Sequence, residues 1–133
     1  MRSSPKKTAA AYPPAEHFLR DLGHWLEWDG EAYRAGLYAI PELGAAPGGV
    51  RAGVWAALAD TIGGAVATRA VQPNWIATSD LSVHIFSAVR DGEISATARL
   101  LRQGRRAAVV EIELFSSAAP DEPVGLATVG FSV

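Results

Sequence analysis

Residues 52–68 read AGVWAALADTIGGAVAT, an apolar stretch whose single charge is Asp60. A stretch that is apolar on nearly every side predicts a helix buried against the rest of the protein. A carboxylate in such surroundings costs free energy unless a partner or a chemical role compensates for it. We therefore interpret Asp60 as a functional carboxylate, one that takes part in chemistry or binding. The alternative is an aspartate that caps or turns the chain between two short helices, with a break at Gly63 and Gly64.

The composition describes a small globular chain and excludes several classes of function. The 133 residues suffice for one domain, and 49% of them are hydrophobic and 20% charged. A net charge of −2 gives no reason to expect binding to nucleic acid. Without cysteine there is no thiol nucleophile, disulfide or cysteine metal site. No segment has the length and hydrophobicity of a signal peptide or a membrane span, so we expect a cytoplasmic protein without membrane contact.

The region before residue 52 predicts a tail, a short helix and a strand. Residues 1–14 are polar and alanine-rich and end in two prolines, which indicates a mobile tail before a single domain of residues 15–133. Phe18, Leu22, Trp25 and Leu26 recur at helical spacing and predict a short N-terminal helix. Residues 32–40 predict the first strand.

The region after residue 69 predicts four more strands, at residues 76–86, 93–102, 106–115 and 124–133. The first three alternate apolar and polar residues. Asp91 and Gly92 indicate a hairpin turn, Gln103 and Gly104 another, and residues 116–123 a polar loop. One long helix with five strands predicts an α+β fold, an antiparallel sheet curved around a central helix.

Three segments carry a resemblance to a known family: GGVRAGVWAALADTIGGAVA with TSDLSVHIF, DGEISATARLLRQGRRAAVVEIELF, and VGLATVGFSV. Together they resemble the hotdog-fold acyl-CoA thioesterases of the phenylacetate-pathway type, over about residues 33–133. The resemblance implies a five-stranded antiparallel sheet wrapped around a long central helix. It also implies a homodimer formed side by side, or a homotetramer made of two such dimers.

The resemblance assigns catalytic roles to four positions. The acid of the central helix, general base or nucleophile in the family, corresponds to Asp60. The backbone N–H that polarises the thioester carbonyl corresponds to Ala52, with Gly53 beside it. A hydroxyl that the partner subunit contributes corresponds to Thr78. The chain departs from the family at Arg51, where relatives commonly carry histidine, and at Ala45, where several carry asparagine.

The spacing of the helix start and the acid agrees with a site shared between subunits. Eight residues separate Ala52 from Asp60, so the two lie about 12 Å apart along a helix. That distance is too long for both groups of one subunit to reach one carbonyl. In a dimer, the helix start of one subunit can face the acid of the other.

Further candidates for binding the substrate have competing interpretations. The guanidinium of Arg51 can bind a carbonyl, carboxylate or phosphate, or it can be a solvated residue at the helix start. Trp55 can line an acyl pocket or belong to the core. A basic turn can hold the phosphates of coenzyme A or form a solvated hairpin tip; its residues are Arg102, Gln103, Gly104, Arg105 and Arg106.

Asp80, Ser82 and His84 alternate along one strand, and residues two apart stand too far from each other for a catalytic triad. His17 and His24 lack a partner at the spacing of a metal site, so we propose no metal.

Two functions remain open on the sequence. The first is an acyl-CoA thioesterase that uses Asp60 at a site shared between subunits, with coenzyme A as part of the substrate and no separate cofactor. The second is a non-catalytic protein of the same fold that binds acyl-CoA or an acyl carrier, which the departures at Arg51 and Ala45 favour. A dehydratase is disfavoured because no histidine accompanies the helix or the loop before it.

Overall fold

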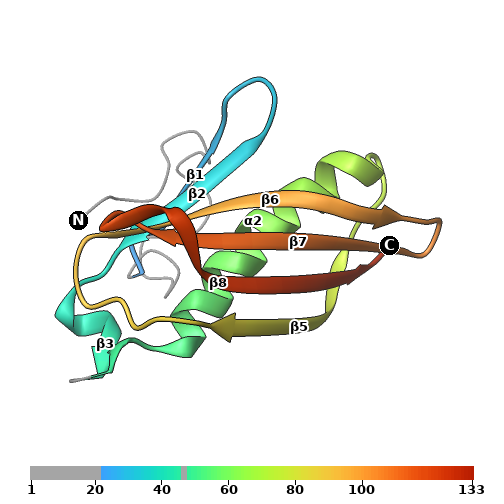
Figure 1. Cartoon of the computed structure of the whole chain (residues 1–133). Helices are drawn as coiled ribbons and strands as arrows, with labels where there is room; N and C mark the ends of the chain where they lie inside the picture. The colour runs from blue at the N-terminus through green and yellow to red at the C-terminus, as the bar shows by residue number, and fades with distance from the viewer. Residues whose placement is uncertain (1–21, 46–47) are drawn as a thin grey trace.

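The computed structural model describes residues 22–45 and 48–133, so the tail predicted at residues 1–14 lies outside the described residues (Figure 1). One long helix, α2 (Ala52–Val71), packs against an antiparallel sheet. The elements that precede it are β1 (Trp25–Trp28), β2 (Tyr33–Tyr38), the 3-10 turn η2 (Pro41–Leu43), β3 (Gly44–Ala45) and β4 (Gly49–Val50). Those that follow are β5 (Ala77–Ile85), β6 (Glu93–Gln103), β7 (Ala107–Ser116) and β8 (Ala119–Ser132).

The main sheet has six strands in the order β1-β2-β6-β7-β8-β5, and every neighbouring pair is antiparallel. A helix packed on an antiparallel sheet was predicted from the sequence, but the expected number of five strands is wrong. The additional strand is β1, which lies in the segment that we expected to be helical. Because β1 and β5 are the two edges, β5 pairs with β8 alone among the described strands.

The predicted central helix is continuous through Gly63 and Gly64, so the alternative of two short helices is wrong. Trp55, Leu58 and Ile62 face the sheet and are buried. A Cβ atom added at Gly63 would lie 3.4 Å from both Ile112 and Phe131, so glycine lets the helix approach β7 and β8 closely. The helix was expected to be largely buried; the side that faces the sheet is buried, and its far side is half-buried or exposed.

The inner face of the sheet follows the predicted alternation. Ile94 and Ala96 of β6 point into the core. The same face of β7 contributes Ala108, Val110, Ile112 and Leu114, all fully buried. The core therefore lies between this face and α2.

The predicted N-terminal helix is wrong where the structure describes it. Trp25 and Leu26 belong to β1, while Phe18 lies outside the described residues. Helical spacing over four apolar residues is a local signal, and two long-range interactions override it here. β1 pairs with β2, and Trp25 Nε1 donates a hydrogen bond to Glu93 Oε2 over 2.6 Å.

Two connections also differ from the prediction. Asp91 and Gly92 precede β6 but form no hairpin, because β5 and β6 lie apart in the sheet. Residues 119–123 continue β8 rather than form a loop, so the β7–β8 turn is tight. The turn at Gln103 and Gly104 is confirmed, with Gly104 N donating to Ala107 O over 2.8 Å. No helix among the described residues is long and apolar enough to cross a membrane.

Candidate functional site

Asp60 and Thr78 meet at the boundary between α2 and the edge strand β5. The Thr78 hydroxyl donates a hydrogen bond to Asp60 Oδ1 over 2.8 Å. Thr78 is opposite Phe131 of β8, so its side chain lies on the face of the sheet that α2 covers. The two residues belong to one chain, whereas the resemblance implied that the hydroxyl comes from a partner subunit. The pair therefore forms without a second subunit.

The Asp60 carboxylate retains capacity to accept a further proton or hydrogen bond. It is half-buried, and within residues 22–45 and 48–133 the Thr78 hydroxyl is its one hydrogen-bonding partner. The helix side around it carries the small residues Gly53, Ala56 and Gly64. A carboxylate held by one donor and flanked by small side chains is accessible to a thin substrate or to water.

The start of α2 offers unpaired backbone donors. Arg51 N donates to Leu43 O over 3.0 Å, and the first bonds within the helix start at Val54 and Trp55. The N–H groups of Ala52 and Gly53 precede that ladder and have no acceptor in the described part of the chain. A Cβ atom added at Gly53 would have no heavy atom within 4 Å, so the space beside it is open. This helix end favours a developing negative charge.

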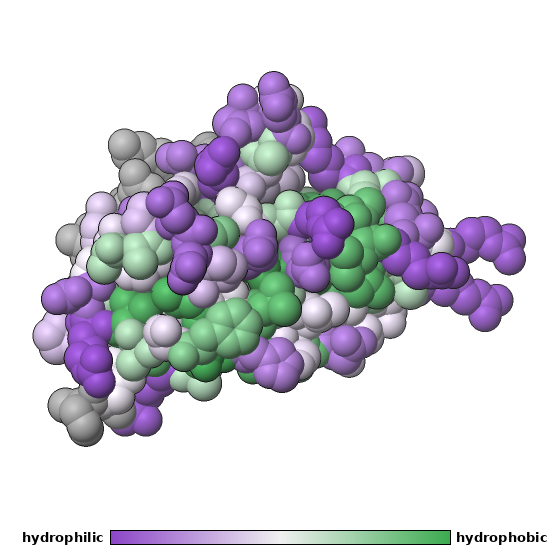
Figure 2. All heavy atoms as spheres, in the orientation of Figure 1, coloured by the Kyte–Doolittle hydropathy of each residue, from purple (hydrophilic) through white to green (hydrophobic). Residues whose placement is uncertain are grey.

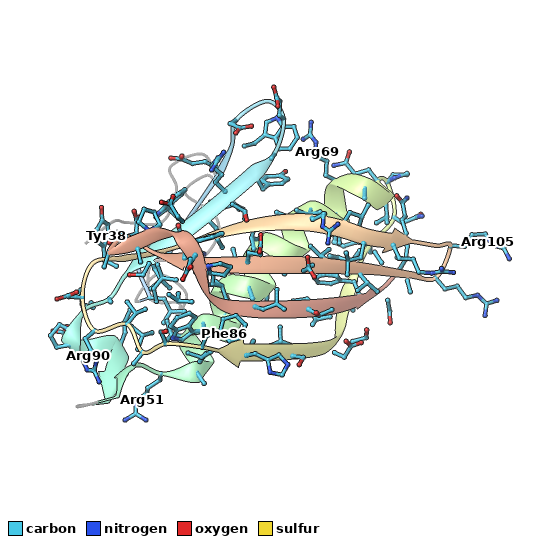
Figure 3. The ribbon with its side chains drawn as sticks, viewed as in Figure 1. Tyr38, Arg51, Arg69, Phe86, Arg90 and Arg105 are labelled. Atoms are coloured by element: carbon cyan, nitrogen blue, oxygen red, sulfur yellow. The ribbon has the colours of Figure 1, made fainter. Side chains whose placement is uncertain are left out.

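The Arg51 side chain is exposed and makes no capping hydrogen bond. It lies at one end of the molecule, where Figure 3 shows it pointing into solvent. A guanidinium in that position is available to a ligand at the helix start, and nothing in the described residues fixes it structurally.

The assignment of Trp55 to a substrate pocket is wrong. Its side chain is 1% exposed, and its Nε1 donates to Val50 O over 3.1 Å. Its ring packs against Gly125 of β8, where an added Cβ atom would lie 3.1 Å from it. Trp55 is a core residue because the sheet covers this side of the helix.

The basic turn between β6 and β7 lies at the other end of the molecule from Arg51. Figure 3 shows Arg105 extending beyond the sheet there, and Figure 2 shows polar side chains protruding at the same end. An open pocket of about 400 Å³ lies beside the turn, lined in part by Gln103, Gly104 and Arg105. Gln103 Nε2 donates to Ala70 O over 2.9 Å and so joins the turn to the last turn of α2.

Asp80, Ser82 and His84 do not form a catalytic triad in the structure. Ser82 Oγ lies 3.5 Å from His84 Nε2, at the limit of a hydrogen bond, while Ser79 Oγ donates to Asp80 Oδ2 over 3.1 Å. In the part of the chain that the structure describes, no three His, Asp or Glu side chains are placed to hold a metal ion.

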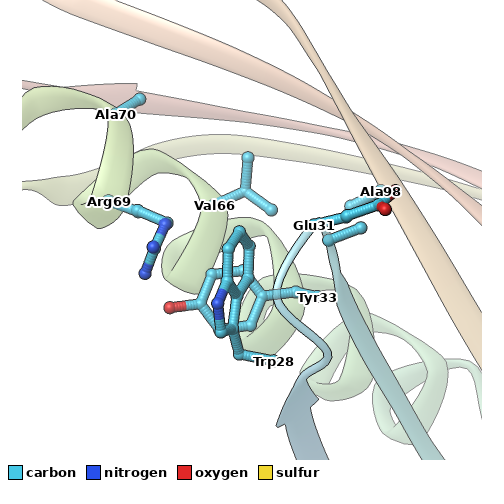
Figure 4. A pocket seen from close by; sticks show the side chains of 8 residues that line it. Trp28, Glu31, Tyr33, Val66, Arg69, Ala70 and Ala98 are labelled. Atoms are coloured by element: carbon cyan, nitrogen blue, oxygen red, sulfur yellow. The ribbon is translucent and has the colours of Figure 1, made fainter.

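Sequence reasoning missed one feature, a pocket between the β1–β2 hairpin and the C-terminal half of α2 (Figure 4). Trp28 and Arg69 form it, and they lie far apart in the sequence. The only hint in the sequence was its four tryptophans, a number that does not show which of them lines a pocket.

Comparisons with known proteins give the following matches. Residues 48–119 match the family model described as the thioesterase superfamily. A thioesterase from Haemophilus influenzae is 21% identical, with a TM-score of 0.79 over 89% of this chain and 82% of that one. A phenylacetic acid degradation-related protein from Ralstonia eutropha is 23% identical, with a TM-score of 0.75 over 90% and 92%. A Bacillus halodurans protein solved with CoA is 26% identical, with a TM-score of 0.68 over 80% and 70%. No curated protein sequence matches.

Proposed function

Because the chain belongs to the thioesterase superfamily, as its resemblance predicted, and is a thioester hydrolase, we propose that it hydrolyses acyl-CoA thioesters with the Asp60 carboxylate as general base or nucleophile. The observation that carries this proposal is the hydrogen bond from the Thr78 hydroxyl to Asp60 Oδ1. It fixes one carboxylate oxygen and leaves the other free to act on a water molecule or on the thioester.

As a general base, Asp60 takes a proton from water while the water oxygen attacks the acyl carbon. The carbonyl oxygen becomes negatively charged, the C–S bond then breaks, and the thiolate of coenzyme A leaves and takes up the proton. As a nucleophile, Asp60 instead attacks the acyl carbon and displaces the thiolate of coenzyme A, which gives an acyl anhydride that water hydrolyses. Label in Asp60 after a single turnover in water labelled with ¹⁸O would identify the nucleophilic route, with water attacking the aspartyl carbonyl of the anhydride, because the general-base route places label only in the released acid.

The negative charge on the carbonyl oxygen needs donors, which the N–H groups of Ala52 and Gly53 supply. Donors of this kind contribute about 3–4 kcal/mol to transition-state stabilisation. They lie about 12 Å from Asp60 of the same chain. The active site is therefore formed between two subunits, with the helix start of one facing Asp60 and Thr78 of the other.

The edge strand β5 is suited to join the two subunits. Its outer backbone edge is unpaired within the described residues, and Leu81 and Ile85 are 39% and 38% exposed on the face that carries the core. Phe86, which directly follows β5, is 59% exposed and adds an apolar side chain at this edge (Figure 3). A second copy that pairs with β5 would cover the unpaired edge and the exposed side chains together.

Substrate binding requires two further groups of residues. Arg51 lies beside the proposed oxyanion donors and selects for a polar or acidic acyl group. The turn with Arg102, Arg105 and Arg106 holds phosphates of coenzyme A, as its open pocket and its positive charge allow.

Hydrolysis of a panel of acyl-CoA thioesters, followed by the release of free thiol, tests the function. We expect Asp60→Asn to lower kcat a hundredfold or more, because it keeps the shape and removes the base. Asp121→Asn, at an exposed position near the start of β8, is the matched control and should retain activity. Equal turnover by wild type and Asp60→Asn would refute the assigned role. Tight binding without hydrolysis would favour the non-catalytic alternative.

A further inference from the structure

A second pocket, of about 220 Å³, lies across α2 from Asp60 (Figure 4). The β1–β2 hairpin contributes Trp28, Glu31 and Tyr33, and α2 contributes Val66 and Arg69. Successive residues of a helix turn by about 100°, so Asp60 and Arg69, nine residues apart, project from opposite sides of α2. The pocket is therefore distinct from the surface around Asp60 and Thr78.

One wall of this pocket is an aromatic pair with a cation on it. The rings of Trp28 and Tyr33 have centroids 4.9 Å apart at an angle of 56°. Arg69 Cζ lies 3.7 Å from the centroid of the Trp28 ring. A stacked guanidinium keeps its in-plane N–H donors, and those of Arg69 have no acceptor within the described ranges of the chain. The Arg69 guanidinium thus offers a flat face and a row of free donors to a ligand.

Glu31 supplies an acceptor to the same pocket, and hydrogen bonds within the hairpin turn hold its backbone. Asp29 Oδ1 accepts hydrogen bonds from the backbone N–H groups of Glu31 and Ala32, each 2.8 Å long. These bonds lower the pKa of Asp29, that from Ala32 most, because they favour its ionised form. The Glu31 carboxylate itself has no partner in the portion of the chain that is described.

The combination selects one class of ligand. A simple carboxylate would be attracted by Arg69 and repelled by Glu31. A planar ring with a donor on its edge can stack on the outer face of the Arg69 guanidinium and donate to Glu31, and stacking on guanidinium and aromatic planes is how proteins bind nucleobases.

We propose that this pocket binds the adenine ring of coenzyme A, an inference that rests on the proposed function. The adenine ring stacks on the outer face of the Arg69 guanidinium, and its amino group donates to Glu31. Ala70 lines both this pocket and the one beside the basic turn, so the two are contiguous at the end of α2. The phosphates held by Arg105 would then lie next to the base.

Binding of adenosine 3′,5′-bisphosphate, measured by calorimetry, tests the pocket without depending on hydrolysis. We expect Arg69→Leu and Trp28→Leu to weaken this binding about tenfold or more, because the first removes the stacking surface and the second removes the ring that holds the guanidinium in place. Arg99→Leu is the matched control, since Arg99 pairs with Glu111 on the other face of the sheet and should leave the affinity unchanged. Thermal unfolding checks that each variant is folded.

Steady-state kinetics show whether the adenine that binds in this pocket belongs to coenzyme A or to a free nucleotide. Arg69→Leu should raise the KM for acyl-CoA and leave unchanged the KM for the same acyl group on 4′-phosphopantetheine, which lacks the adenosine. Weaker binding of the bisphosphate with an unchanged KM for acyl-CoA would refute coenzyme A as the source and identify a site for a free adenine nucleotide. Equal affinity of wild type and both variants for the bisphosphate, or no binding at all, would refute the pocket. Bisphosphate binding that depends on Arg69, without hydrolysis of any thioester, would refute the proposed function alone.

Discussion

The hydrogen bond between Thr78 and Asp60 is the smallest unit on which the mechanism depends. It orients the carboxylate: one oxygen accepts the hydrogen bond, and the other stays free to act on the substrate or on water. Asp60 was identified from its isolation in an apolar stretch, and Thr78 from the family resemblance alone. That both belong to one chain could not be predicted, because it depends on how β5 returns along α2.

We expect Thr78→Val to lower kcat by about ten- to a hundredfold, in line with the loss of one hydrogen bond to a charged group. Thr78→Ser keeps the hydroxyl and should remain close to wild type. Steady-state kinetics on the best acyl-CoA of the panel measure both. A valine variant with the kcat of the wild type would show that the hydroxyl does not orient the carboxylate for catalysis.

Single residues also show where sequence reasoning fails. An aromatic residue near the helix start suits a substrate pocket and the core equally well. The sequence does not show which side of the helix faces the sheet, and Trp55 lies on that side. The pairing of Trp28 with Arg69 depends on the β1–β2 hairpin folding over the end of α2, and no local pattern encodes it.

Among the elements, the sequence predicted those whose periodicity agrees with their long-range contacts. The central helix and the strands β6 and β7 follow from their apolar patterns, and the turn between these strands from Gln103 and Gly104. β1 was missed because its residues have helical spacing and become a strand only by pairing with β2. The strand order could not be derived from turn residues, as Asp91 and Gly92 show.

The start of α2 yields a prediction that separates stability from activity. Gly53→Ala adds a methyl group where no heavy atom lies within 4 Å, so the free energy of unfolding should stay unchanged or rise by up to about 1 kcal/mol. The same methyl group narrows the space beside the oxyanion donors, and kcat/KM should fall several-fold. Denaturant unfolding and kinetics on the same sample check both expectations.

Gly36→Ala is the contrasting control for that experiment. An added Cβ atom there would lie 2.8 Å from the Ile94 carbonyl oxygen and 2.8 Å from the Trp25 ring, so this variant should be less stable. A Gly53→Ala enzyme with full activity would mean that the substrate does not occupy the space beside the helix start.

At the scale of the whole molecule, the exposed edge strand predicts a dimer. Light scattering at micromolar concentration should give at least twice the mass of one chain, and Leu81→Glu should produce a monomer that has lost activity although Asp60 is intact. Leu101→Glu is the matched control, because Leu101 is 46% exposed on a strand away from β5. A wild-type monomer with full activity would rule out a site shared between subunits.

Mixing two inactive variants tests the shared site most directly. Asp60→Asn removes the carboxylate, and Gly53→Leu fills the space beside the oxyanion donors; each variant alone should be inactive. After unfolding and refolding together, each mixed dimer would contain one complete site, made of the intact helix start of one chain and the intact Asp60 of the other. Random pairing then predicts recovery of about a quarter of the wild-type activity. Mixed dimers that form and remain inactive would contradict the account, since they would place both groups of each site in one chain.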